Sequence, residues 1–265
     1  PVAQPVAQPV AVQIDGLEEA IKSFLVSCDP ECFIPERQDI DDESKAINPY
    51  LFVDYLFELL NKDDVVITGN GSACVMTFQA AKIKQGQRLY TNSGSASMGY
   101  DLPASIGAAI AKKGSRVICL AGDGSIMMNL QELQTIRGYN LPIKVFILNN
   151  DGYVSIKQTQ EAYFSDNIAG VDSKSGVTIP NFTHLGKALN IPSIKITKLS
   201  ELSSSSFIKI FNSDKPGTFE IIIDPNQGFS PKLTSRKLDD GIMVSPALHD
   251  MSPFLDRDEL AKNIL

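Results

Sequence analysis

Histidine and cysteine are scarce in this sequence, and their placement argues against the common soft-metal sites. The chain of 265 residues has two histidines, His184 and His249, and four cysteines. The cysteines are Cys28, Cys32, Cys74 and Cys119. These positions do not form the paired spacing of a zinc site, and a pair at 28 and 32 would need further soft ligands. We therefore expect no zinc site.

Basic residues and long apolar runs are also in short supply. The 24 lysines and arginines face 31 acidic residues, which gives a net charge of -7 at pH 7. A surface for nucleic acid needs the opposite balance, so we expect no nucleic-acid partner. No apolar run approaches the ~18 residues that cross a bilayer, and no signal-peptide pattern is present at the start. We expect no membrane partner, and reduced cysteines without an export signal favour the cytoplasm.

The first residues differ in character from those that follow. The chain starts with PVAQPVAQPV, a repeat too short for a repeat architecture and typical of an extended linker. Residues 10–27 predict a strand, a turn and an amphipathic helix, and residues 28–46 a polar linker. We expect residues 1–46 to be the tail of a preceding middle domain and a linker, within a longer protein.

From Ile47 onwards, strand and helix patterns alternate. Strands are expected over 65–68, 116–121, 143–148, 194–196 and 218–223, and helices over 49–60, 102–111, 127–137, 182–189 and 203–212. Asn48 is placed to cap the first helix, with Pro49 at its first position. Nearly continuous apolar strands between helices predict a doubly wound α/β domain over 47–224, with a parallel sheet covered on both faces. Residues 225–265 are expected to form a tail packing over this domain.

Polar residues follow two of the predicted strands. Gly122-Asp123-Gly124-Ser125 comes after RVICLA, and Asn149-Asn150-Asp151-Gly152 after IKVFIL. The carboxyl ends of parallel strands meet at one edge of a sheet, so Asp123 and Asn150 are expected to lie together. Carboxylate, amide and backbone carbonyl oxygens suit Mg²⁺, and amides at the start of the next helix suit a phosphate. An acidic chain must hold phosphate in such a way, so we predict a metal–diphosphate site.

The specificity of this signal depends on both motifs. Gly-Asp-Gly alone is most often an ordinary turn. A second strand ending in Asn-Asn-x-Gly, one crossover away, makes the turn interpretation much weaker.

The two motifs and their surroundings resemble the thiamine diphosphate enzymes of the acetolactate synthase-like group. The similar segments are TNSGSASMGYDLPASIGA, LAGDGSIMMNLQELQT and LNNDGYVSIKQTQ. The resemblance covers about 47–224. It implies the thiamine diphosphate-binding fold, a three-layer α/β/α arrangement with a mostly parallel six-stranded sheet.

The resemblance also implies roles for individual residues. Asp123, Asn150 and Gly152 would bind Mg²⁺, the last through its carbonyl. The residues that would bind the cofactor are Asn70, Gly71, Ser72, Ala96, Ser97, Met98, Gly122, Asp123, Gly124, Ser125, Asn150, Gly152 and Tyr153. Met98 would support the folded cofactor, with the Ala96 carbonyl and the Met98 amide bonding its pyrimidine ring. Core packing for Met98 and a tight turn for Asn70-Gly71 remain equal alternatives.

The substrate side is predicted from two further positions. Ile156 replaces the glutamate that the resemblance places in simple decarboxylases, which favours carboligation from pyruvate to a second carbonyl. Thr159 replaces a tryptophan of acetolactate synthases and suggests a different or larger acceptor. The acceptor is expected to be a second 2-oxo acid or a keto-sugar nucleotide, the latter because the tail SRKLDDGIMVSPALHDMSPFLDRDEL resembles those of acetolactate synthase-like proteins that modify sugars. A non-oxidative 2-oxo acid decarboxylase and a non-catalytic structural or regulatory half stay open as alternatives.

No catalytic residue is expected on this chain. The resemblance places the activating glutamate on a separate pyrimidine-binding domain, normally supplied by a second subunit, in a homodimer or homotetramer. The chain is therefore expected to hold half of a site for thiamine diphosphate and Mg²⁺. Whether FAD also binds stays open.

Overall fold

The computed structural model describes residues 46–164, 167–237 and 242–263. They fall into two compact units, one ending at Lys232 and one beginning at Leu233. The predictions for residues 1–45 lie outside the described residues. None of the described helices has the length and apolar character that a membrane span requires.

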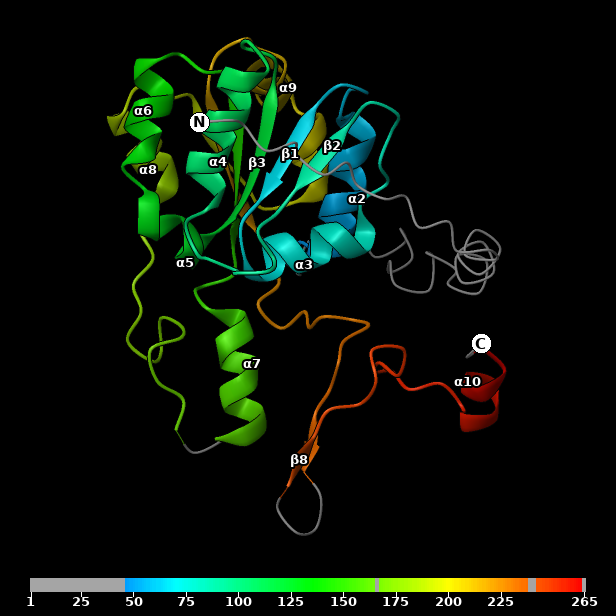
Figure 1. Ribbon diagram of the computed structural model, residues 1–265. Helices are drawn as coiled ribbons and strands as arrows, with labels where there is room; N and C mark the ends of the chain where they lie inside the picture. Colours follow the sequence, from blue (N-terminus) through cyan, green and yellow to red (C-terminus); the bar gives the residue numbers. More distant parts are fainter. Residues whose placement is uncertain (1–45, 165–166, 238–241, 264–265) are drawn as a thin grey trace, which may run out of the picture. The chain divides into compact units, whose positions relative to one another are not determined.

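The first unit is built on one parallel sheet (Figure 1). Its strand order is β2-β1-β3-β4-β6-β5, and every neighbouring pair is parallel. The strands are β1 (Val65–Thr68), β2 (Arg88–Tyr90), β3 (Val117–Gly122), β4 (Ile143–Asn149), β5 (Ser193–Ile196) and β6 (Gly217–Ile222). The predicted six-stranded sheet is confirmed, and it is parallel throughout.

Helices cover both faces of this sheet, so the predicted three-layer α/β/α class is also confirmed. One face packs against α2 (Pro49–Leu59), α3 (Gly71–Ala80) and α9 (Ser205–Phe211). The other packs against α4 (Asp101–Ala111), α6 (Glu132–Gly138) and α8 (Phe182–Ala188). The remaining helices of this unit are α5 (Asp123–Ile126), η3 (Met127–Asn129), α7 (Val154–Tyr163) and η4 (Leu199–Ser203).

Alternation along the strands explains the two cores. In β3, Ile118 and Leu120 face the first core, whereas Val117, Cys119 and Ala121 face the second. Successive side chains of a strand point to opposite faces, so a strand covered on both sides must be apolar throughout. Cys119, within the run RVICLA, is fully buried as a small apolar residue.

Aromatic rings fill the centre of the first core. Phe146 of β4 stacks on Phe219 of β6 with ring centroids 4.6 Å apart, and Phe52, Phe207 and Phe211 pack around it. Such ring pairs contribute about 0.5–1.5 kcal/mol beyond the area they bury. The sheet is therefore held rigidly behind the strand ends that carry the two motifs.

Three elements between Ile47 and Lys198 were not predicted from the sequence, and one predicted helix is interrupted. These are α3, the short edge strand β2 and α7. Val154 is the buried residue of α7, so this helix lacks the apolar stripe by which amphipathic helices are recognised. The helix predicted over 127–137 is the 3-10 turn η3 followed by α6, with Leu130 and Gln131 between them.

Residues 225–232 contact α2 and α3. The Ser230 amide donates to Tyr50 Oη at 3.0 Å, and Gln79 Nε2 donates to the Pro231 carbonyl at 2.7 Å. The second unit contains the antiparallel pair β7 (Arg236–Lys237) and β8 (Met243–Val244), followed by α10 (Arg257–Asn263). That residues 225–265 cover the domain as one tail stays a prediction.

Candidate functional site

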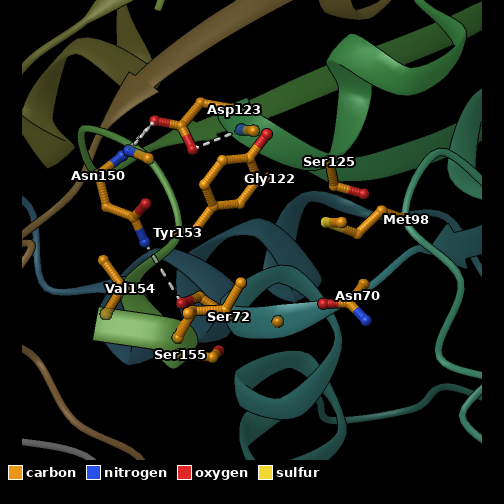
Figure 2. A pocket seen from close by; sticks show the side chains of 14 residues that line it. Asn70, Ser72, Met98, Gly122, Asp123, Ser125, Asn150, Tyr153, Val154 and Ser155 are labelled. Carbon is orange, nitrogen blue, oxygen red and sulfur yellow. Dashed lines mark hydrogen bonds between the residues drawn. The ribbon is translucent and has the colours of Figure 1, made fainter. Parts of the chain in front are cut away.

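The two predicted motifs lie side by side at the carboxyl edge of the sheet (Figure 2). Strands β3 and β4 are neighbours, and their register pairs Gly122 with Leu148. Asp123, the next residue along and the first of α5, therefore lies close to Asn149 and Asn150 at the end of β4. The Asn150 amide donates to Asp123 Oδ2 at 3.2 Å.

Backbone amides orient the Asp123 carboxylate. Oδ2 also accepts from the Gly152 amide at 2.9 Å, and Oδ1 accepts from the Gly124 amide at 2.8 Å. The side chain is fully buried, and burial raises its pKa to about 6, although these three amides pull the pKa down. None of the ion pairs between described residues involves Asp123. A buried carboxylate without a side-chain cation is suited to a metal ion.

The neighbouring residues of Asp123 offer amide and backbone oxygens as further ligands for such an ion. Among the described residues, no three histidine, cysteine or acidic side chains cluster to hold a metal. The Asn150 side chain donates through Nδ2 to Ser72 Oγ at 3.3 Å, which leaves Oδ1 as its acceptor. This donor set, one carboxylate with amide and carbonyl oxygens, fits a hard cation such as Mg²⁺.

At two glycines of the motifs, neighbouring atoms leave no room for a side chain. Gly152 has a φ of +125°, and a Cβ there would lie 2.3 Å from the Val171 carbonyl oxygen. A Cβ on Gly124 would lie 2.4 Å from the ring of Tyr153. The turn after β4 and the start of α5 are therefore packed closely against their neighbours, and larger residues would push them apart.

A separate loop, which contains residues 171–175, is hydrogen-bonded to the turn after β4. The Tyr153 amide donates to the Val171 carbonyl at 2.7 Å, and Ser173 Oγ donates to Asp151 Oδ2 at 2.6 Å. Asp172 in this loop pairs with Lys157 Nζ at 3.0 Å. Hydrogen bonds from Ser175 and then from Lys157 lower the pKa of Asp172 to about 2. The loop thus stays charged and fixed at neutral pH.

The third part of the site is the loop between β1 and α3. Asn70 precedes α3, and its Nδ2 donates to the Ala96 carbonyl. Ser72 accepts from Asn150, as described above. Gly71 has a φ of +59°, and a Cβ there would lie 3.6 Å from Ser155 Oγ of α7. This loop therefore joins the segment around Ala96 to the turn after β4.

These loops surround a pocket of about 420 Å³, its open mouth included. It is lined by Asn70, Gly71, Ser72, Met98, Gly122, Asp123, Gly124, Ser125, Asn150, Gly152, Tyr153, Val154, Ser155 and Ile156. No lysine, arginine or histidine is among these described lining residues. Met98 and Ile156 add an apolar side and are 40% and 46% exposed.

Most predicted site residues line this pocket, and three do not. Ala96 and Ser97 are exposed beside it, and the Ala96 carbonyl bonds to Asn70. Thr159 lies further along α7, where its hydroxyl donates to the Ser155 carbonyl at 3.1 Å. The structure adds Val154 and Ser155, which the sequence reasoning missed. Both lie within the segment LNNDGYVSIKQTQ, and a helix predicted after its glycine would have indicated them.

Comparisons with known proteins agree with this geometry. The family model described as "Thiamine pyrophosphate enzyme, C-terminal TPP binding domain" matches residues 69–221, more than half of the chain. Acetolactate synthase 2, chloroplastic, of Zea mays is 32% identical over 196 residues, 72% of this chain and 31% of that protein. The acetolactate synthase large subunit of Cyanidium caldarium is 32% identical over 198 residues, 75% of this chain and 33% of that protein. The chain thus spans about a third of the length of these curated relatives.

Proposed function

Because this chain belongs to the thiamine pyrophosphate enzymes, through their C-terminal TPP-binding domain, we propose that it serves an acetolactate synthase-like carboligase. The reaction moves a two-carbon unit from pyruvate, with loss of carbon dioxide, to a second carbonyl compound. The observation that carries the proposal is the buried Asp123 carboxylate, oriented by the backbone amides of Asn150 and Gly152 in a pocket whose lining, among the described residues, includes no basic side chain.

In this proposal, different residues bind the metal ion, the diphosphate and the rings of the cofactor. Asp123 and Asn150 hold Mg²⁺ through side-chain oxygens, and Gly152 holds it through its carbonyl. Gly124 and Ser125 bind the diphosphate at the start of α5, where the Gly124 amide also donates to Asp123 Oδ1 at 2.8 Å, and the loop of Asn70, Gly71 and Ser72 assists them. The other cofactor residues are Ala96, Ser97, Met98, Gly122 and Tyr153, and Met98 offers its exposed apolar side chain to the cofactor's rings.

When bound, thiamine diphosphate supplies an electron sink that makes loss of carbon dioxide from a 2-oxo acid possible. The chain's own contribution is orientation and charge. Asp123 cancels part of the charge of the metal ion, and the amides at the start of α5 face the phosphate oxygens. Hydrogen bonds within the chain orient these groups, and such orientation limits the reorganisation that binding requires.

The substrate side favours carboligation over simple decarboxylation. Ile156 lines the pocket and is 46% exposed. An apolar side chain there has no proton to give and keeps water away from the reacting carbon, so a second carbonyl compound can compete for it. The acceptor is a 2-oxo acid or a keto-sugar nucleotide, and Thr159 widens the acceptor side.

We propose that the half of the site that deprotonates the cofactor lies on a different domain from the one described here. A pyrimidine-binding domain of a second subunit supplies the glutamate, in a homodimer or homotetramer. We propose a cytoplasmic enzyme.

Cofactor binding tests the metal assignment. Titration calorimetry with thiamine diphosphate and MgCl2 is expected to show binding that Asp123→Asn weakens by at least about a hundredfold. Asp64→Asn is the matched control, because Asp64 is a buried carboxylate just before β1, at the amino edge of the sheet and away from the pocket; since it loses the Arg116 ion pair, it is compared under conditions where it is fully folded. It should leave the affinity within about twofold. Unchanged binding in Asp123→Asn would reject the metal site.

Product analysis with pyruvate as the only substrate separates the possible activities of the protein that carries this domain. Acetolactate would support the carboligase. Acetaldehyde would support a non-oxidative decarboxylase, and cofactor binding without either product would support a non-catalytic half.

A further inference from the structure

A second buried carboxylate, Asp101, lies beneath the cofactor pocket. It is the first residue of α4 and is fully buried. Its Oδ1 accepts from the Leu102 amide at 3.0 Å, and Ser105 Oγ donates to its carbonyl at 2.7 Å. Both the side chain and the backbone of Asp101 are therefore fixed within the first turn of α4.

The other carboxylate oxygen reaches two of the pocket's loops. Ser125 Oγ donates to Asp101 Oδ2 at 3.2 Å. On the β1 side, a Cβ built on Gly69 would lie 2.1 Å from the same oxygen. The carboxylate thus occupies the space that a side chain at position 69 would fill. Asp101 therefore packs between the loop after β1 and the start of α5.

Ser125 extends this contact to the segment that holds Met98. The Gly99 amide donates to Ser125 Oγ at 3.0 Å. A hydroxyl has one proton, and that proton goes to Asp101, so the Ser125 side chain has none left for a phosphate oxygen. The three groups form a chain from the Gly99 amide through the Ser125 hydroxyl to the Asp101 carboxylate.

We infer that Asp101 is a positioning residue for the cofactor site: through Ser125 it holds the diphosphate-binding turn and the Met98 segment in one arrangement. This inference rests on the proposed function, since it assigns Gly124 and Ser125 to the diphosphate. A carboxylate near a bound diphosphate is electrostatically unfavourable, which argues against direct contact with that anion. What Asp101 provides is a strong, charge-assisted acceptor in a place closed to water.

The inference predicts a local effect of Asp101→Asn in the cofactor-free protein. Asparagine has one acceptor oxygen where aspartate has two, so it cannot accept from both the Leu102 amide and the Ser125 hydroxyl, and one of these two hydrogen bonds is lost. Hydrogen exchange followed by mass spectrometry is expected to accelerate about tenfold in peptides covering 97–102 and 122–127. Peptides from β4 and β6 should keep the wild-type rates, and Asp64→Asn should leave 97–102 and 122–127 unchanged.

The same variants predict a change in cofactor affinity. Loss of one hydrogen bond to a charged group should weaken binding of thiamine diphosphate with MgCl2 by about ten- to a hundredfold. Ser125→Ala should weaken it similarly, and the double variant should be no weaker than either single variant, because both break one interaction. Purely additive losses would overturn the positioning role.

The outcomes for the two proposals are distinguishable. If the wild-type protein, assembled with the pyrimidine-binding domain that completes its site, binds no thiamine diphosphate, the proposed function fails, and hydrogen exchange alone decides the role of Asp101. If the wild-type protein binds and Asp101→Asn shows wild-type exchange and affinity, the positioning role is wrong. Should Asp101→Asn fail to fold, Ser125→Ala breaks the same hydrogen bond from its other end, and unchanged exchange at 97–102 would overturn the inference.

Discussion

At the scale of single residues, the site uses backbone conformations that few side chains tolerate. Ala96 has a φ of 48°, in the left-handed region that favours glycine. An alanine there costs about 1–2 kcal/mol relative to its ordinary conformation. Two hydrogen bonds hold the residue in place: its amide donates to the Asn92 carbonyl at 2.8 Å, and its carbonyl accepts from Asn70. The strained carbonyl is the group that the proposed function assigns to the pyrimidine ring.

Gly152→Ala separates backbone strain from crowding when it is compared with Gly176→Ala. Gly152 and Gly176 have φ values of +125° and +107°, but no atom lies within 4 Å of a Cβ on Gly176, whereas one on Gly152 meets the Val171 carbonyl at 2.3 Å. We expect Gly176→Ala to lower the free energy of unfolding by about 1–2 kcal/mol. Gly152→Ala should cost about 1–3 kcal/mol more, as measured by urea denaturation. Equal losses would show that the loop around Val171 yields.

Asp101 should also make stability depend on pH. Burial raises its pKa from 3.8 to about 6. Between these values the folded protein binds a proton that the unfolded chain has released, so the free energy of unfolding falls as pH rises through this window. The contribution is at most about 3 kcal/mol. Urea denaturation from pH 4 to pH 7.5 should therefore show a smaller decline in Asp101→Asn than in the wild type, and parallel curves would contradict the expectation.

At the scale of helices and strands, the two ends of the sheet have different tasks. The carboxyl ends carry the pocket, and the amino ends carry a charged cluster that joins strands to a helix. Arg116, just before β3, donates through Nε to Asp64 Oδ1 at 3.0 Å and also bonds Oδ2. Its guanidinium lies 4.4 Å from the ring centroid of Phe211 in α9. This cluster stabilises the fold far from the site.

Arg116→Met should therefore lower stability without changing cofactor affinity. It leaves the Asp64 carboxylate, which is 4% exposed, without its cation. Removing one partner of a buried pair costs about 3–5 kcal/mol, and we expect about 3 kcal/mol because Arg116 is partly exposed. Arg137→Met is the control, since Arg137 is exposed and donates to the Asn190 carbonyl. It should cost under about 1 kcal/mol. An altered affinity for thiamine diphosphate in folded Arg116→Met would show that the two ends are coupled.

At the scale of the whole molecule, charge decides how an anion can bind. The chain has a net charge of -7, and the described residues that line the pocket include no basic side chain. Long-range attraction of a diphosphate is therefore absent. The proposed site depends on backbone amides and on the metal ion for its affinity.

Metal removal tests this dependence. Thiamine diphosphate offered with EDTA in place of MgCl2 should bind at least about a hundredfold more weakly, because the anion would face the Asp123 carboxylate without a cation. Raising NaCl from about 50 to 500 mM in the presence of MgCl2 should change the affinity little, since no field of basic side chains is screened. Tight metal-free binding would mean that the diphosphate lies away from Asp123.

Patterns along the chain were enough to predict the α/β class, the parallel sheet and the two motifs of the pocket, and the family resemblance added Asn70, Gly71, Ser72, Met98 and Tyr153. Apolar strands such as RVICLA and IKVFIL predict a sheet that is covered on both faces. The motifs that follow them name Asp123, Asn150 and Gly152, because in a parallel sheet the chain direction fixes which ends meet. These are local signals, readable from a few neighbouring residues.

Only the tertiary structure decided which distant groups contact one another. The polar helix α7, with Val154 and Ser155 in the pocket, has no apolar period to reveal it. Asp101 lies in the family-like segment TNSGSASMGYDLPASIGA, but the sequence did not predict it to be a site residue. Its partner Ser125 lies 24 residues away, and no local pattern records such a contact. Its burial and its hydrogen bond arise from the packing of α4 against β1 and β3, which a sequence pattern does not encode.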